Sequence, residues 1–187
     1  MRVIAGSARG LRLVAPRDSA TRPVADRVKE TCFAILADRV VDASVLDLYA
    51  GSGALGIEAL SRGAAECVFV ERGREALAAI RQNLVETGFM DRAELAGVEV
   101  SRFLASASVR RFGLAFLDPP YSERAILAPL ERLVPFLIVG ATVVVKHFWR
   151  TEVPDPDGLS RWRERRFGET ALTFLERTVT ADGEDKQ

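Results

Sequence analysis

The sequence predicts a doubly wound α/β fold, in which helices cover both faces of a mostly parallel sheet. From residue 45 onward, five apolar strand-like runs alternate with helix-like stretches, and this alternation is typical of parallel strands joined by crossover helices. Near the C-terminus the alternation stops, and "RWRERRFGETALTFLER" predicts two antiparallel strands joined at Gly168. The sequence therefore predicts a parallel sheet with an antiparallel hairpin at one edge.

Each element follows from a local pattern, in order along the chain. The strand-like runs are "SVLDLYA", "CVFVE", a weaker run near 94–100, "LAFLD" and "ATVVVKH", and helices are predicted over 54–62, 74–87, 101–109 and 123–134. Ahead of the sheet, "TRPVADRVKETCFAILADRV" has apolar residues at helical spacing, with Pro23 at a favourable first helical position. Two short runs within residues 1–17, "RVIAG" and "LRLVAP", predict a β-hairpin. We expect an N-terminal hairpin extension over 1–22, a main domain over 23–180 and a frayed tail over 181–187.

Composition excludes several classes of protein. The 187 residues, 48% of them hydrophobic, suffice for one full core, and 26 basic residues balance 26 acidic ones, so any basic surface must be local. The N-terminus lacks the apolar core of a signal peptide, and "LVPFLIVGATVVV" is too short to span a bilayer, so a cytoplasmic location without membrane contact is expected. His147 is the only histidine, and Cys32 and Cys67 lie far apart, so we expect two core thiols and no metal site.

A glycine-rich loop follows the first predicted strand. Residues 51–56, "GSGALG", fit the G-x-G-x-x-G pattern of a loop that lets a ligand approach the backbone at the start of a helix. Asp47 lies four positions before Gly51, where a carboxylate would repel the phosphates of a dinucleotide but suits the sulfonium and ammonium groups of S-adenosylmethionine. Glu71, at the end of the second strand, can accept both hydroxyls of an unphosphorylated ribose. The pattern therefore favours S-adenosylmethionine.

The tetrapeptide "DPPY" ends the fourth predicted strand. An exocyclic amine of a nucleic acid base is a poor nucleophile, because its lone pair is delocalised into the ring. The Asp118 carboxylate and the Pro119 carbonyl can accept hydrogen bonds from such an amine, and the two consecutive prolines fix the direction of that carbonyl. Tyr121 offers an aromatic face to a base that has left its stack. The alternative interpretation is a rigid strand end without a chemical role.

Five segments in order resemble the RsmD family of ribosomal RNA methyltransferases, and they cover nearly the whole chain: "RVIAGSARGLRL", "TRPVADRVKETCF", "DLYAGSGALGIEALSRGA", "DPPY" and "RFGETALTF". The resemblance implies a Rossmann-like class I methyltransferase fold with a seven-stranded sheet, S-adenosylmethionine as the donor and S-adenosylhomocysteine as its product. It implies methylation of a guanine N2 amine in 16S ribosomal RNA, by a monomer acting on an assembled or assembling 30S particle. Lys146 departs from the family pattern, in which this position is often Glu.

The resemblance also implies a set of site residues. Catalysis is expected at Asp118, Pro119, Pro120 and Tyr121, and cofactor binding at Asp47, Tyr49, Gly51, Ser52, Gly53, Glu71, Arg72, Glu99 and Asp118. No metal ligand is expected.

The first 30 residues form a local basic region. Seven basic residues oppose three acidic ones, which leaves four net positive charges: Arg2, Arg9, Arg12, Arg17, Arg22, Arg27 and Lys29 against Asp18, Asp26 and Glu30. Arginine forks bind phosphates bidentately, and the glycines in "GSARG" allow close approach. RNA binding is therefore predicted at Arg2, Arg9, Arg12, Arg22 and Arg27. The alternative is a solvated hairpin and helix with scattered arginines.

Three other functions remain open from the sequence. A nicotinamide-dependent oxidoreductase leaves Asp47 and the DPPY tetrapeptide unexplained. A catalytically inert RNA-binding module would not require Asp47 or the DPPY tetrapeptide. An adenine-N6 methyltransferase acting on RNA or DNA is the strongest competitor, because DPPY serves amines of both purines, and only the basic N-terminal region argues against it.

Overall fold

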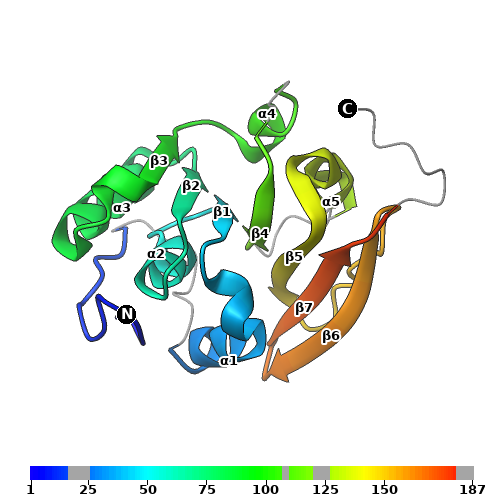
Figure 1. The fold of residues 1–187 in the computed structure, drawn as a ribbon, viewed down its shortest axis with the longest axis horizontal. Coiled ribbons are helices and arrows are strands. Elements are labelled where there is room, and N and C mark those ends of the chain that lie inside the picture. The colour runs from blue at the N-terminus through cyan, green and yellow to red at the C-terminus, as the bar shows by residue number, and fades with distance from the viewer. Residues whose placement is uncertain (17–25, 107–109, 120–126, 180–187) are drawn as a thin grey trace.

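The central feature of the computed structural model is a seven-stranded sheet in the order β3-β2-β1-β4-β5-β7-β6 (Figure 1). The structure describes residues 1–16, 26–106, 110–119 and 127–179. The strands are β1 (Ser44–Leu48), β2 (Glu66–Val70), β3 (Ala93–Ala96), β4 (Phe112–Leu117), β5 (Leu137–Phe148), β6 (Leu159–Phe167) and β7 (Thr170–Arg177). The first five pair in parallel, whereas β7 pairs antiparallel with both β5 and β6. This confirms the predicted doubly wound sheet and its C-terminal hairpin.

Helices cover both faces of the sheet. They are α1 (Asp26–Leu36), α2 (Ala54–Ser61), α3 (Arg74–Thr87), α4 (Val100–Phe103) and α5 (Leu127–Leu133), with short 3-10 turns at Ala37–Val40, Met90–Arg92 and Val134–Phe136. Phe33, Ile57 and Ile80 place α1, α2 and α3 on one core, whereas Val100 and Leu130 place α4 and α5 on the other. Two hydrophobic layers therefore enclose the sheet. Across the described ranges, no helix has the length and apolar character needed to cross a membrane.

The third strand differs from its predicted span. The run near 94–100 was expected to be one strand, but β3 ends at Ala96 and α4 begins at Val100. The amide of Val98 donates to the carbonyl of Ala96, which turns the chain, and the amide of Phe103 donates to the carbonyl of Glu99 to start the helix. Val100 is apolar because the first turn of α4 buries it in the second core, not because it continues a strand.

Residues 1–16, the N-terminal arm, double back on themselves, and the two predicted runs are joined by backbone bonds from Val3 to Leu11, from Gly10 to Val3 and from Leu13 to Met1. Arg2 and Arg12 form one isolated antiparallel bridge. The arm also uses its backbone to bind α2: the amides of Ile4 and Ala5 donate to the Glu58 carboxylate at 2.8 and 3.0 Å. Gly6 lies so close to α2 that a Cβ atom there would be 1.8 Å from the carbonyl oxygen of Ser61. The arm is thus held both by its own cross-strand bonds and by its contacts with α2.

Candidate active site

The strand register brings polar side chains together at the carboxyl edge of the sheet. Four strand residues lie level with one another across β2, β1, β4 and β5: Val70, Leu48, Leu117 and Val145. The next residue along each of these segments is polar: Glu71, Tyr49, Asp118 and Lys146. Ligands of open parallel sheets bind at this edge. Segments up to 97 positions apart in the sequence, from Tyr49 to Lys146, therefore form one row.

The glycine loop is held from both sides by carboxylates. The amide of Gly51 donates to Glu71 Oε2 at 3.0 Å, and the amide of Gly73 donates to Glu71 Oε1 at 2.8 Å. Below the loop, Asp47 is only 1% exposed, and its Oδ2 accepts from the amide of Gly56 at 3.0 Å. These contacts fix the loop in advance of any ligand, with Glu71 at its rim and Asp47 beneath it.

The loop contains local features that only its tertiary setting explains. Tyr49 has a φ of 59°, a left-handed conformation that costs a non-glycine residue about 1–3 kcal/mol. Gly56 has a different role, because a Cβ atom there would lie 2.3 Å from the Phe69 ring and 2.6 Å from Cys67 Sγ. The third glycine of the pattern thus permits α2 to pack closely on β2. Cys67 and Cys32 are both buried, as predicted for core thiols.

Three carboxylates, Asp47, Glu71 and Asp118, give this edge a negative potential. Burial raises the pKa of Asp47 well above its usual value, the bond from Gly56 opposes that rise, and the charges of Asp118 and Glu71 add to it. A cation placed among these groups would relieve their mutual repulsion, whereas a phosphate would increase it. The charge distribution therefore suits a positively charged ligand.

Asp118 is held by a lysine that sequence reasoning did not select as a site residue. Lys146 Nζ donates to Asp118 Oδ1 at 2.7 Å and to Oδ2 at 2.8 Å. Partial burial raises the pKa of Asp118 above its usual value, and the Lys146 ammonium opposes that rise. The only sequence signal was a basic residue at the end of the fifth strand. The contact with Asp118 requires the β4–β5 register.

Arg72 and Glu99, two of the predicted cofactor residues, contact one another. Arg72 Nη1 lies 2.5 Å from Glu99 Oε1, and both side chains are largely exposed. Glu99 was expected at the end of the third strand but occupies the position just before α4, without a capping bond from its side chain. Ser52 and Gly53 lie in the glycine loop, as predicted. Whether any of these groups binds a cofactor stays a prediction.

Asn83 joins the N-terminal arm to the glycine loop, and no sequence pattern indicated it. This fully buried side chain accepts from the amide of Val14 at 2.7 Å and donates to the carbonyl of Val14 at 2.9 Å. Its Nδ2 also donates to the carbonyl of Ser52 at 2.9 Å. One amide group therefore fixes the position of the arm relative to the loop.

The predicted RNA-binding residues have different environments. Arg9, Arg12 and Arg27 are exposed, whereas Arg2 lies 3.3 Å from the carboxylate of Asp26. Arg22, Pro120 and Tyr121 lie outside the described residues, and Pro119 is buried.

The position of Lys29 corrects the sequence-based prediction, which counted this residue with the basic N-terminal region. It is fully buried and lies 3.0 Å from Glu58, and its ammonium also donates to the carbonyl of Arg2 at 2.6 Å. The reason is that α1 packs this helix face against the arm and α2, so its charge neutralises Glu58 and is not offered to solvent.

Comparison with known proteins identifies the family. The family model described as "Conserved hypothetical protein 95" matches residues 1–176. The chain belongs to this family. YlbH of Bacillus subtilis (strain 168) is 35% identical over 182 residues, covering 95% of this chain and 99% of YlbH. Ribosomal RNA small subunit methyltransferase D of Escherichia coli (strain K12) is 34% identical, covering 98% of this chain and 93% of the relative.

The solved structure of yhhF from Escherichia coli is similar with a TM-score of 0.85 and 34% identity, over 95% of this chain and 98% of that one. The resemblance to the RsmD family and the class I methyltransferase fold predicted from the sequence are both confirmed.

Proposed function

We propose that this member of the RsmD family methylates the exocyclic N2 amine of a guanine in 16S ribosomal RNA, with S-adenosylmethionine as the donor. The observation that carries the proposal is the Asp118 carboxylate, held by Lys146 in one row with Glu71 at the carboxyl edge of the sheet. A relative that spans nearly the whole chain is named ribosomal RNA small subunit methyltransferase D, which supports this substrate class.

The residues at this edge fit the proposed donor. S-adenosylmethionine, when bound, supplies a methyl group on a positively charged sulfur and leaves as S-adenosylhomocysteine. Glu71 holds Gly51 and Gly73 with one oxygen each, and every carboxylate oxygen has a further lone pair for a ribose hydroxyl. Asp47 lies beneath the loop with a raised pKa, and a positively charged donor would favour its ionised form. The proposed donor site comprises Asp47, Tyr49, Gly51, Ser52, Gly53, Glu71, Arg72, Glu99 and Asp118.

Asp118 acts on the acceptor amine. Its carboxylate accepts a hydrogen bond from the amine and so favours a pyramidal nitrogen, whose lone pair is no longer delocalised into the ring. The Pro119 carbonyl accepts the second N–H, and Tyr121 stacks on the base. Lys146 keeps both carboxylate oxygens in place, so that little reorganisation is needed as positive charge develops on the nitrogen. Asp118 then receives the proton that the methylated amine loses.

Several finer features belong to the same proposal. The protein acts as a monomer in the cytoplasm, on the assembled or assembling 30S particle, and needs no metal ion for methyl transfer. Arg9, Arg12 and Arg27 bind RNA phosphates, with Arg2 and Arg22 contributing from the same region. The exposed guanidinium groups of Arg9, Arg12 and Arg27 support this assignment.

The test uses Asp118→Asn, which keeps the shape of the side chain but removes its charge. We expect single-turnover methylation of 16S ribosomal RNA to fall about 10²- to 10³-fold, because a preorganised electrostatic contact is lost. Affinity for S-adenosylhomocysteine, measured by calorimetry, should fall much less than the methylation rate, because Asp118 is one of several groups in the proposed donor site and the one that contacts the acceptor amine. Near wild-type methylation by the variant would refute the role of Asp118. Mass mapping of the modified nucleotide separates the two purines, and an N6-methyladenine product would replace the guanine assignment. Binding of NADH without S-adenosylhomocysteine would overturn the donor.

A further inference from the structure

The C-terminal hairpin places a basic surface beside the proposed active site. β6 is the outermost strand of the sheet (Figure 1), and most of its side chains are exposed. In the antiparallel register, Thr170 pairs with Phe148 and Leu172 pairs with Lys146. The turn of the hairpin therefore lies at the same edge of the sheet as the Asp118–Lys146 pair.

Two arginines converge on one indole ring at this edge. The guanidinium carbon of Arg166 lies 3.6 Å from the Trp149 ring centroid, and that of Arg150 lies 4.7 Å from it. The amide of Trp149 donates to the carbonyl of Glu169 at 2.9 Å, and Arg166 Nε donates to the carbonyl of Gly168 at 2.8 Å. Backbone contacts on both sides of the hairpin turn thus hold the ring and one of its arginines in place.

These arginines differ from others on the same hairpin or beside it. Arg161 lies 3.4 Å from Asp155 and 3.5 Å from Glu164, and Arg39 lies 2.6 Å from Glu176. Within the described part of the chain, neither Arg150 nor Arg166 has a salt bridge to a carboxylate. Two like charges held near one ring without a carboxylate between them repel one another. An anion that binds both relieves that repulsion.

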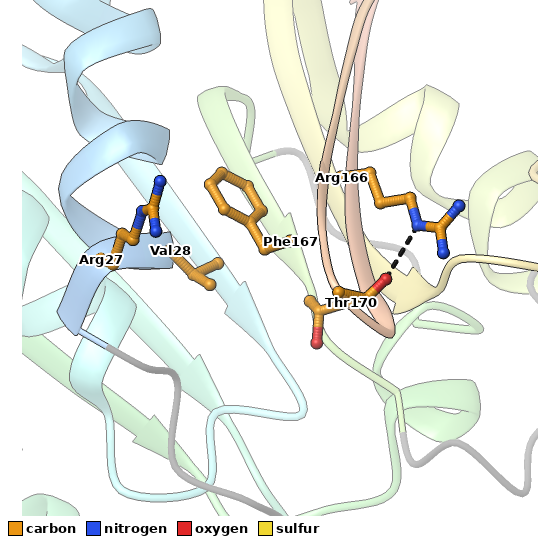
Figure 2. A pocket seen from close by; sticks show the side chains of 6 residues that line it. Arg27, Val28, Arg166, Phe167 and Thr170 are labelled. Atoms are coloured by element: carbon orange, nitrogen blue, oxygen red, sulfur yellow. Dashed lines mark hydrogen bonds between the residues drawn. The ribbon is translucent and has the colours of Figure 1, made fainter.

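A third arginine lies across a pocket from the hairpin. Arg27 and Val28 of α1, together with Arg166, Phe167, Gly168 and Thr170, line a pocket of about 390 Å³. Figure 2 shows the Phe167 ring directed from the hairpin toward Val28 of α1, whereas the Arg166 guanidinium points away from Arg27. Arg27 is exposed but lies on the α1 side of the hairpin, apart from the Arg150 and Arg166 guanidinium groups.

We propose that Arg150 and Arg166, held at Trp149, form a phosphate clamp for the RNA backbone next to the target nucleotide. This inference rests on the proposed function, because it takes ribosomal RNA as the occupant. Charge complementarity supports that occupant: the chain has no net charge, yet unpaired guanidinium groups gather at the active-site edge. Arginine binds phosphate with two parallel donors.

The test compares Arg150→Glu/Arg166→Glu with a matched control, Arg81→Glu/Arg132→Glu. The control changes two exposed arginines on α3 and α5 and alters the net charge equally. Binding of a 16S ribosomal RNA fragment is measured at several salt concentrations. We expect the clamp variant to bind about tenfold more weakly at low salt, and the slope of log K against log salt to decrease by about 1.4, or 0.7 for each lost phosphate contact. The control should retain the wild-type slope.

Two further measurements keep the result interpretable. Binding of S-adenosylhomocysteine and the thermal unfolding midpoint should match the wild type, and the milder Arg150→Gln/Arg166→Gln variant should show the same loss of slope if the first variant folds poorly. An unchanged RNA affinity and slope in a folded variant would overturn the clamp, and the arginines would then serve only to protect an edge strand. If wild-type protein does not methylate the RNA, the proposed function fails, whereas RNA binding still tests the clamp.

Discussion

Among the described residues, two lysine–carboxylate pairs, one between helices α1 and α2 and one at the edge of the sheet, differ in what surrounds them. Lys29 and Glu58 are both completely buried, and Glu58 also accepts from Arg62 Nε at 2.8 Å. Lys146 and Asp118 lie at the carboxyl edge, with side chains that are 11% and 22% exposed. The first pair is enclosed by the N-terminal arm, α1 and α2, whereas the second remains open to a ligand.

The comparison shows that a lysine–carboxylate pair can have either a structural or a catalytic role. The Glu58 carboxylate accepts hydrogen bonds from two arm amides and from Arg62, and it forms a salt bridge with Lys29, so little capacity is left for a substrate. Asp118 is anchored by Lys146 yet reaches solvent, so it can still accept a hydrogen bond from an incoming amine. Enclosure makes the first pair a structural contact, and exposure makes the second a candidate catalytic one.

The largest effect is expected from breaking the enclosed pair. Glu58→Ala leaves the Lys29 ammonium and two arm amides buried without their acceptor, so the free energy of unfolding should fall by about 3–5 kcal/mol. Urea denaturation followed by circular dichroism measures this loss. Glu86→Ala, on the exposed side of α3, is the control and should change stability by about 0.5 kcal/mol or less. A loss below about 1 kcal/mol at Glu58 would show that the arm is not held by this carboxylate.

Breaking the open pair should affect catalysis more than folding. Lys146→Met removes a charge-assisted contact worth about 1.5–3 kcal/mol, so kcat should fall roughly 10- to 100-fold with little change in donor affinity. Without the ammonium, the pKa of Asp118 rises further, and the acidic limb of the pH–rate profile should move to higher pH. Lys146→Arg should restore the position of that limb. An unmoved limb in Lys146→Met would contradict a role through Asp118.

A substitution at Asn83 tests whether the N-terminal arm influences donor binding through the glycine loop. Asn83→Ala leaves the carbonyl of Ser52 and both backbone groups of Val14 without a partner, so we expect a loss of stability of about 1–2 kcal/mol. Calorimetry with S-adenosylhomocysteine should also show weaker binding, because the glycine loop loses a fixed contact. Gln82→Ala, an exposed neighbour on α3, should leave both quantities unchanged. Donor affinity that stays at the wild-type value would confine Asn83 to the arm.

The smallest effect concerns His147, a buried polar group outside both pairs. Its ring nitrogens contact the carbonyl of Phe148 and the hydroxyl of Thr173, each at 2.9 Å. Burial lowers the pKa of His147, the nearby Glu164 partly opposes this, and Arg161 adds to it. Its contribution to stability is therefore present above about pH 6.5, the usual histidine pKa, and is lost as pH falls through the lower pKa of the folded protein.

Urea unfolding between about pH 7 and pH 5 should show this loss in the wild type. The His147→Gln variant should show a shallower dependence, because glutamine has no proton to gain. Parallel pH profiles for the two proteins would mean that other groups, not His147, set the dependence.

The sequence by itself determined the order of elements and the residues that carry local patterns. The helix predicted over 74–87 is observed with the same bounds, and the glycine loop and Asp118 stand at strand ends where apolar runs stop. These features depend on hydrophobic periodicity and turn chemistry, which act over a few neighbouring residues. The weak run near 94–100 was misread because two valines in a tight turn imitate the alternation of a strand.

Tertiary structure alone decided which charged groups are buried, paired or open. The sequence predicts Lys29 as part of a basic surface, but α2 and the N-terminal arm bury it. Lys146 contacts Asp118 only because of the β4–β5 register. Arg150 and Arg166 are 16 positions apart and meet at Trp149 because β7 folds back beside β5. The reason is physical: the energy of a charge depends on its solvent exposure and its neighbours, and both are set by contacts between segments distant in the sequence.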